Sequence, residues 1–217
     1  MHQQSPLHYV SRPSSLKENA PLLIMCHGFG SDENDLFSFA SELPEELYII
    51  SVRAPYILQP YGFAWYAINF DADRGKWSDN EQALASVKTL HTFLDYVINT
   101  YPVNPNNVTL LGFSQGSILS YALALTHPKK ITNVIALSGY INKDIMPSQY
   151  DYESIKQLNF FCSHGSNDQV IPVEWARQTS PFLDELNTNY EYKEYPVGHG
   201  VAPQNFFDLK DWLFKHI

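Results

Sequence analysis

The segment 110–116 places a serine between two glycines, directly after an apolar run and directly before a helical pattern. A strand that turns sharply into a helix at a serine holds the seryl oxygen clear of the backbone, and flanking glycines avoid collision with neighbouring chain. A serine held in this way can attack a carbonyl carbon. An ordinary glycine-flanked turn also fits so short a pattern. Ser114 is therefore a candidate nucleophile whose partners must be sought elsewhere in the chain.

A serine hydroxyl needs a base that takes its proton and a third group that orients the base. His199 is the best candidate base, because it lies between two glycines in the turn before the last helical segment. Asp168 follows an apolar strand and can accept a hydrogen bond from the other imidazole nitrogen. Alone, this aspartate also fits a helix-initiating turn. The chain order Ser114, Asp168, His199 favours the catalytic interpretation, because a large class of serine enzymes uses that order.

Seven other histidines compete for the role of base. Five lie near the termini or on helical patterns and are expected to be solvated or packed: His2, His8, His91, His127 and His216. His27 and His164 each end a strand before a glycine. We interpret both as structural, because hydrogen bonding of an imidazole in a crowded strand-to-loop turn explains them.

Acyl transfer places negative charge on the former carbonyl oxygen, which fixed backbone N–H groups must stabilise. The glycine-rich segment 27–30 follows the first buried strand, and the amides of Phe29 and Gln115 are the expected donors. A glycine-rich loop after a first strand also suggests nucleotide binding. Here, however, neither Gly-x-Gly-x-x-Gly nor a phosphate-binding lysine accompanies it. We expect an oxyanion hole and neither cofactor nor metal.

Short apolar runs alternate with helical patterns, which predicts a mostly parallel sheet covered by helices on both faces. The expected strands are 21–26, 47–52, 108–113, 133–137, 159–163 and 190–195, with a weaker one near 8–11. The expected helices are 33–41, 79–100, 115–126, 173–187 and 203–215, the clearest being 79–100 with its capping box and regular apolar spacing. The stretches 53–77 and 139–157 lack clear periodicity. Long structured loops of this kind are commonly functional.

Composition bounds the class of protein. With 217 residues and 44% hydrophobic content, the chain is expected to form one domain over 1–217 with a sizeable core. A net charge of −9 and no basic run beyond Lys129–Lys130 make nucleic acid and anionic membrane surfaces poor partners. The first residues do not form a targeting signal and no run approaches about 18 apolar residues, so we expect a cytoplasmic protein without integral membrane association. Cys26 and Cys162 end apolar runs, and we expect small buried thiols rather than a disulfide or a metal pair.

Six linked segments resemble the phospholipase/carboxylesterase family, which includes bacterial carboxylesterases and acyl-protein thioesterases. They are 27–36, 53–55, 112–116, 137–140, 164–172 and 198–200. The resemblance implies a single-domain α/β-hydrolase fold with a mostly parallel central sheet, helices on both faces and no cap domain. It also implies triad roles for Ser114, Asp168 and His199 and oxyanion positions for Phe29 and Gln115. A homodimer is compatible with the family, although no surface stripe in the sequence argues for it.

The stretch 56–77 differs in sequence from the acyl-protein thioesterases of that family and contains seven aromatic residues. They are Tyr56, Tyr61, Phe63, Trp65, Tyr66, Phe70 and Trp77. Such rings provide rigid apolar surface that can wall an acyl pocket, and they can equally complete the core over the sheet. We expect Trp65, Tyr66 and Phe70 at the substrate pocket, together with Tyr140 and Val170.

These residues predict an enzyme that hydrolyses a small-molecule carboxylic ester through an acyl-enzyme intermediate. Thioesters and lysophospholipids remain open as substrates, and so does an acyl-protein thioesterase activity. A serine peptidase would use the same triad, but such enzymes usually carry a second, gating domain for which this chain has no room. A non-catalytic ligand-binding protein on the same fold is the alternative from a different class, and it would normally have lost one triad member.

Overall fold

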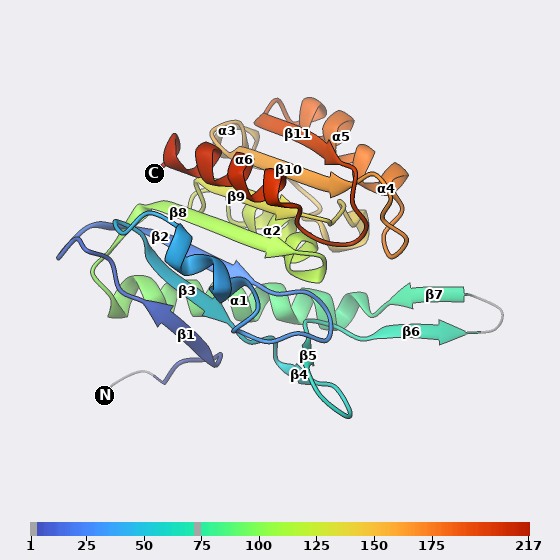
Figure 1. The fold of residues 1–217 in the computed structure, drawn as a ribbon, viewed down its shortest axis with the longest axis horizontal. Coiled ribbons are helices and arrows are strands. Elements are labelled where there is room, and N and C mark those ends of the chain that lie inside the picture. Colours follow the sequence, from blue (N-terminus) through green and yellow to red (C-terminus); the bar gives the residue numbers. More distant parts are fainter. Residues whose placement is uncertain (1–3, 72–74) are drawn as a thin grey trace.

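A seven-stranded sheet runs through the middle of the molecule (Figure 1). The computed structural model describes the backbone of residues 4–71 and 75–217, and the side chains of those residues outside 70–77. The strand order is β1-β3-β2-β8-β9-β10-β11. The bounds are β1 (Tyr9–Arg12), β2 (Ala20–Cys26), β3 (Tyr48–Val52), β8 (Val103–Phe113), β9 (Asn133–Leu137), β10 (Asn159–Gly165) and β11 (Asn189–Tyr195). Every neighbouring pair is parallel except β1 with β3.

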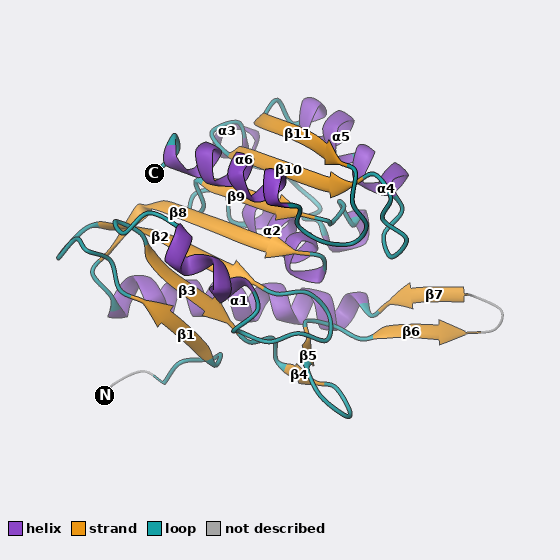
Figure 2. Cartoon of the chain, viewed as in Figure 1, coloured by secondary structure: helices purple, strands orange, loops and turns teal. Residues whose placement is uncertain are grey.

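Helices cover both faces of this sheet (Figure 2). On one face lie α1 (Asn80–Thr100), α2 (Gln115–Thr126), α3 (Tyr152–Ile155) and α5 (Thr179–Glu185), and on the other lie the 3-10 helix η1 (Leu36–Glu42) and α6 (Pro203–Phe214). No helix of the described chain is both long and apolar enough to cross a lipid bilayer. The prediction of a mostly parallel sheet with helices on both faces is confirmed.

Strand β2 shows why the apolar runs are continuous. Leu22, Ile24 and Cys26 join the core cluster beneath α1 and α2, whereas Leu23 and Met25 join the cluster beneath η1 and α6. Successive side chains of a strand point to opposite faces, so a strand covered on both sides needs apolar residues at every position. Both thiols, Cys26 and Cys162, are buried and free.

The region 56–78 contains two hairpins that the sequence did not predict. They are β4 (Tyr56–Ile57) with β5 (Phe63–Ala64), and β6 (Ile68–Asp71) with β7 (Gly75–Ser78), both antiparallel. The second hairpin projects away from the body beside the carboxyl end of the sheet (Figure 1). Strands of two to four residues are too short to show the alternation on which sequence reasoning relies.

Several expected boundaries were wrong. The expected helix 173–187 is two helices, α4 (Val173–Arg177) and α5, because Pro181 is tolerated only in the first turn of a helix and so favours a new start shortly before it. The expected helix 33–41 is the 3-10 helix η1, whose Asp35 makes no capping hydrogen bond and instead accepts one from the Ser31 hydroxyl. The stretch 139–157 holds the short 3-10 helix η2 (Lys143–Ile145) as well as α3.

Candidate active site

Ser114 lies at the sharp turn between β8 and α2, with a φ of 54°. Its amide donates to the carbonyl of Leu137 on the neighbouring strand, which helps to hold this strained conformation. A Cβ atom on Gly112 would lie 2.4 Å from the backbone of Gly116, and one on Gly116 would lie 1.9 Å from the carbonyl oxygen of Cys26. Both glycines are therefore required by close approach of backbone to backbone.

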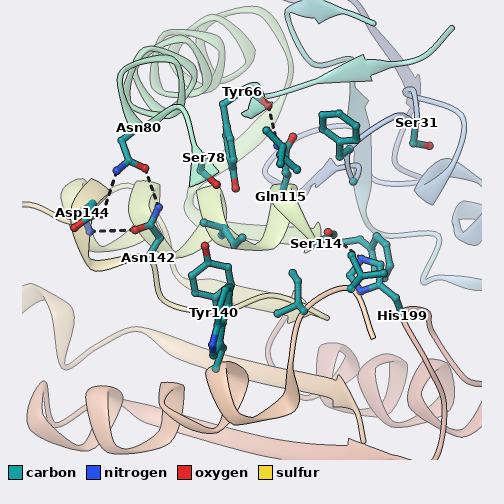
Figure 3. Close-up of a pocket in the computed structure, with 18 of the residues that line it drawn as sticks. Ser31, Tyr66, Ser78, Asn80, Ser114, Gln115, Tyr140, Asn142, Asp144 and His199 are labelled. Atoms are coloured by element: carbon teal, nitrogen blue, oxygen red, sulfur yellow. Dashed lines mark hydrogen bonds between the residues drawn. The ribbon is translucent and has the colours of Figure 1, made fainter. Parts of the chain in front are cut away.

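The three residues expected to form a triad lie in hydrogen-bond contact. His199 Nε2 is 3.0 Å from Ser114 Oγ, and His199 Nδ1 is 2.7 Å from Asp168 Oδ2. They follow β8, β10 and β11, and because these strands are parallel their carboxyl ends meet at one edge of the sheet. Figure 3 shows the His199 ring beside the Ser114 hydroxyl.

Asp168 is almost fully buried and is held in one orientation. Its Oδ1 accepts hydrogen bonds from the amides of Val170 and Ile171, at 2.8 and 2.9 Å. Burial acts to raise the pKa of Asp168, but the hydrogen bonds from His199 and from the two amides outweigh it and lower that pKa. The carboxylate is therefore ionised at neutral pH and can stabilise an imidazolium at His199.

The two histidines interpreted as structural lie beneath the site. His27 is fully buried, its Nδ1 lies 2.7 Å from the carbonyl oxygen of Gly28, and its Nε2 accepts from the amide of Ala54. His164 Nε2 lies 2.9 Å from the carbonyl oxygen of Ile171 and 3.3 Å from Asp168 Oδ2. The ring of His27 has both nitrogens committed to the backbone, and that of His164 supports the loop that carries Asp168.

The two residues expected to supply the oxyanion donors lie in the same cavity as Ser114. Phe29 follows β2 and Gln115 is the first residue of α2, and both line the same cavity as Ser114. Within residues 4–71 and 75–217, neither of their amides donates a hydrogen bond to another protein group. The amino-terminal end of α2 also carries the positive end of the helix dipole. This arrangement suits a developing negative charge.

The Gln115 side chain joins the turn at Ser114 to the aromatic stretch 56–77. Its Oε1 accepts from the amide of Trp65 at 3.0 Å, and its Nε2 donates to the carbonyl of Tyr66 at 2.9 Å. The expectation that Trp65 lines the pocket was wrong. Its side chain is fully buried and does not line the cavity beside Ser114, and the indole N–H donates to the carbonyl of His27. A large ring with a polar N–H packs favourably where a buried acceptor is within reach.

A cavity of about 630 Å³ opens beside Ser114. Tyr66, Tyr140 and Val170, which we expect at the substrate pocket, line this cavity, whereas the side chain of Phe70 lies outside the described residues. Sequence reasoning missed several further lining residues: Ser31, Asp35, Ile68, Ser78, Asn80, Asn142, Asp144 and Trp175. Ile68, Asn142 and Asp144 fall in the two stretches without periodicity, which was the one signal that could have found them.

Comparison with known proteins identifies the family. A family model described as phospholipase/carboxylesterase matches residues 10–217. A probable carboxylesterase SOBER1-like of Arabidopsis thaliana is 31% identical over 152 residues, which cover 69% of this chain and 58% of that protein. Acyl-protein thioesterase 1 of Emericella nidulans is 26% identical over 226 residues, covering 94% of this chain and 93% of that one. The crystal structure of the Bacillus cereus carboxylesterase has the same fold, with a TM-score of 0.81 at 19% identity over 97% of this chain and 95% of that one.

The fold is that of an α/β hydrolase, and Ser114 lies at the strand-to-helix turn between β8 and α2. The chain belongs to the phospholipase/carboxylesterase family, which confirms the resemblance drawn from its sequence. It spans 58–61% of the length of the plant carboxylesterases that it matches.

Proposed function

We propose that this protein is a serine esterase that hydrolyses carboxylic esters through an acyl-enzyme at Ser114. One observation carries the proposal: a continuous hydrogen-bonded chain links Asp168, His199 and Ser114, and it ends in a cavity beside two unengaged backbone amides. The relatives named carboxylesterase and acyl-protein thioesterase support the same chemistry.

In the proposed mechanism, His199 Nε2 takes the proton of the Ser114 hydroxyl while Oγ attacks the ester carbonyl. The negative charge that forms on the carbonyl oxygen is stabilised by the amides of Phe29 and Gln115. The protonated His199 then gives its proton to the departing alcohol. Water, activated by the same imidazole, attacks the acyl-enzyme and releases the acid. Asp168 stabilises the imidazolium throughout and fixes its orientation.

A fluorophosphonate that reacts with activated serines tests the nucleophile directly. Intact-mass spectrometry should show one adduct on the wild-type chain and none on Ser114→Ala. p-Nitrophenyl esters with acyl chains of two to sixteen carbons, assayed in parallel, should be hydrolysed by the wild type and not by the variant. An adduct that persists in Ser114→Ala would assign the nucleophile elsewhere, and neither adduct nor turnover in the wild type would favour a ligand-binding protein.

The acyl-protein thioesterase named above matches nearly the whole chain, and this favours thioesters as a second substrate class. A matched pair of substrates, an oxygen ester and a thioester with the same acyl group, separates the two activities. A kcat/KM for the thioester that exceeds that for the ester, after division by the hydroxide-catalysed rate of each, would assign the thioesterase. The reverse would assign the carboxylesterase.

A further inference from the structure

The end of the cavity that lies away from Ser114 is polar. Asn80, at the start of α1, faces Asn142, which directly precedes η2, and Asp144 within η2. All three are well separated from the serine in Figure 3. Asn80 Nδ2 donates to Asp144 Oδ2 at 3.1 Å, and Asn142 Nδ2 donates to Asn80 Oδ1 at 3.2 Å. The Asp144 amide in turn donates to Asn142 Oδ1 at 3.1 Å. Three side chains from two elements thus hold one another in fixed orientations.

This network uses one oxygen of the Asp144 carboxylate. In the described part of the chain, no protein group donates to the other oxygen, Oδ1, and no lysine or arginine lines the cavity. The second carboxylate of the cavity, Asp35, is hydrogen-bonded to Ser31, on the opposite side of Ser114 from Asp144 in Figure 3. A substrate that fills the cavity therefore meets negative charge at both ends.

Two aromatic rings line the same cavity as Asp144. Tyr140 and Trp175 line the cavity and pack edge to face, with ring centroids 5.2 Å apart. Tyr66 lies across from Tyr140, with Ser78 between them (Figure 3). Burial raises the pKa of Tyr140, and the nearby charge of Asp144 raises it further, so the phenol is neutral and within reach of that charge.

A cavity that offers both aromatic rings and a carboxylate can recognise an organic ammonium group, because the ring faces and the negative charge each attract it. We propose that this end of the cavity binds the ammonium group of a cationic ester, with the Asp144 carboxylate and the rings of Tyr140 and Trp175 as its contacts. The inference rests on the proposed esterase function and names its substrate class. It also predicts that anionic esters are poor substrates, because they meet carboxylates and no compensating basic side chain among the described lining residues.

Three p-nitrophenyl esters of matched shape test the proposal. They carry the 4-(trimethylammonio)butanoyl group, the neutral 5,5-dimethylhexanoyl group in which carbon replaces the nitrogen, and the anionic glutaryl group. Each kcat/KM is divided by the hydroxide-catalysed rate of the same ester, which removes differences in intrinsic reactivity. We expect the cationic ester to exceed the neutral one about 10-fold and the anionic ester to fall below it by a similar factor.

The variant Asp144→Asn keeps the shape of the side chain and removes its charge. We expect it to bring the ratio of cationic to neutral kcat/KM close to one. The matched control is Glu153→Gln, which removes one negative charge from an exposed side chain outside the cavity and should leave the ratio as in the wild type. A wild-type ratio near one, or an unchanged ratio in Asp144→Asn, would overturn the proposal. A ratio that falls to about one in Asp35→Asn, and not in Asp144→Asn, would also overturn it, because the ammonium group would then bind at the Asp35 end of the cavity.

A failure of the proposed function looks different. If none of the three esters is hydrolysed, the esterase proposal fails, and the subsite is tested by calorimetric titration of butyltrimethylammonium into the wild type and into Asp144→Asn. Saturable binding to the wild type that weakens about 10-fold in the variant would support the ammonium site. Absence of binding, or equal binding by both proteins, would refute it.

Discussion

Replacement of Gly116 by alanine tests the close packing on which the turn at Ser114 depends. The added Cβ would lie 1.9 Å from the carbonyl oxygen of Cys26 and 2.5 Å from its carbonyl carbon, and both atoms belong to β2, an interior strand of the sheet. To reach the 3.0 Å that real Cβ contacts keep, α2 and β2 must move apart by about 1.1 Å. Strand β2 is hydrogen-bonded to β3 and to β8, so it cannot shift without disturbing two ladders.

Overpacking of a close-packed core costs about 1–3 kcal/mol, and the upper end applies here because the obstacle is backbone rather than a flexible side chain. For a chain of this size, about 3 kcal/mol lowers Tm by about 6–12 °C. Strand β2 also leads directly to Phe29, so the proposed oxyanion donor shifts with it. A misplacement of about 1 Å at a reacting centre costs on the order of 100-fold in rate, which is the expected fall in kcat/KM.

Differential scanning calorimetry and ester hydrolysis measure the two effects. The matched control is Gly200→Ala, since a Cβ at Gly200 meets nothing within 4 Å, and its Tm should stay within about 2 °C of the wild type. The reasoning is refuted if the Tm of Gly116→Ala stays within about 2 °C of the wild type and its kcat/KM stays within about threefold. In that case the contact between Gly116 and the Cys26 carbonyl does not constrain the turn.

Two further substitutions and one change of pH test other parts of the protein. Asp168→Asn should lower kcat by about 10⁴, because the amide no longer holds His199 in the required tautomer, and a loss smaller than about 10-fold in p-nitrophenyl ester turnover would contradict the triad. Gln115→Leu keeps the backbone amide but leaves the Trp65 amide and the Tyr66 carbonyl without partners, so urea denaturation should show a loss of about 1–3 kcal/mol. An unchanged free energy of unfolding would mean that the Gln115 side chain does not stabilise the backbone at Trp65 and Tyr66. Burial lowers the pKa of His27, His91 and His127 below their ordinary 6.5, so the unfolded chain binds protons more readily and stability should fall as the pH drops below about 6.5. Urea denaturation at pH 7.5 and 5.5 measures that loss, and equal free energies at the two pH values would contradict it.

Prediction from sequence succeeded where a residue's neighbours along the chain decide its structure. The helix expected at 115–126 and the strand expected at 133–137 have the observed bounds, because each is an apolar segment with a clear start and end. The elements whose ends depend on distant contacts were less well predicted. Strand β8 begins at Val103 rather than near 108. Val103 pairs with Ala20 of β2, beyond a register shift between Ala20 and Leu22.

Of the residues expected at a substrate pocket, Tyr66, Tyr140 and Val170 line the cavity beside Ser114 and Trp65 does not. Trp65 and Tyr66 are adjacent aromatic residues with the same local pattern. Only the tertiary structure decides that one indole turns back towards the carbonyl of His27 while the neighbouring phenol lines the cavity. Periodicity carries no information about such a choice, since it depends on which buried acceptor is within reach.

The sequence by itself determined the α/β class, the turn at Ser114 and the chain order Ser114, Asp168, His199, because these follow from local spacing and from the alternation of strands and helices. Tertiary structure alone decided the distances among the three residues, the hairpins of 56–78 and the polar far end of the cavity. Asn80 and Asp144 are 64 positions apart, and their contact exists only because α1 and the η2 segment pack together. No pattern within either segment specifies such a meeting, because it is set by the packing of the whole core.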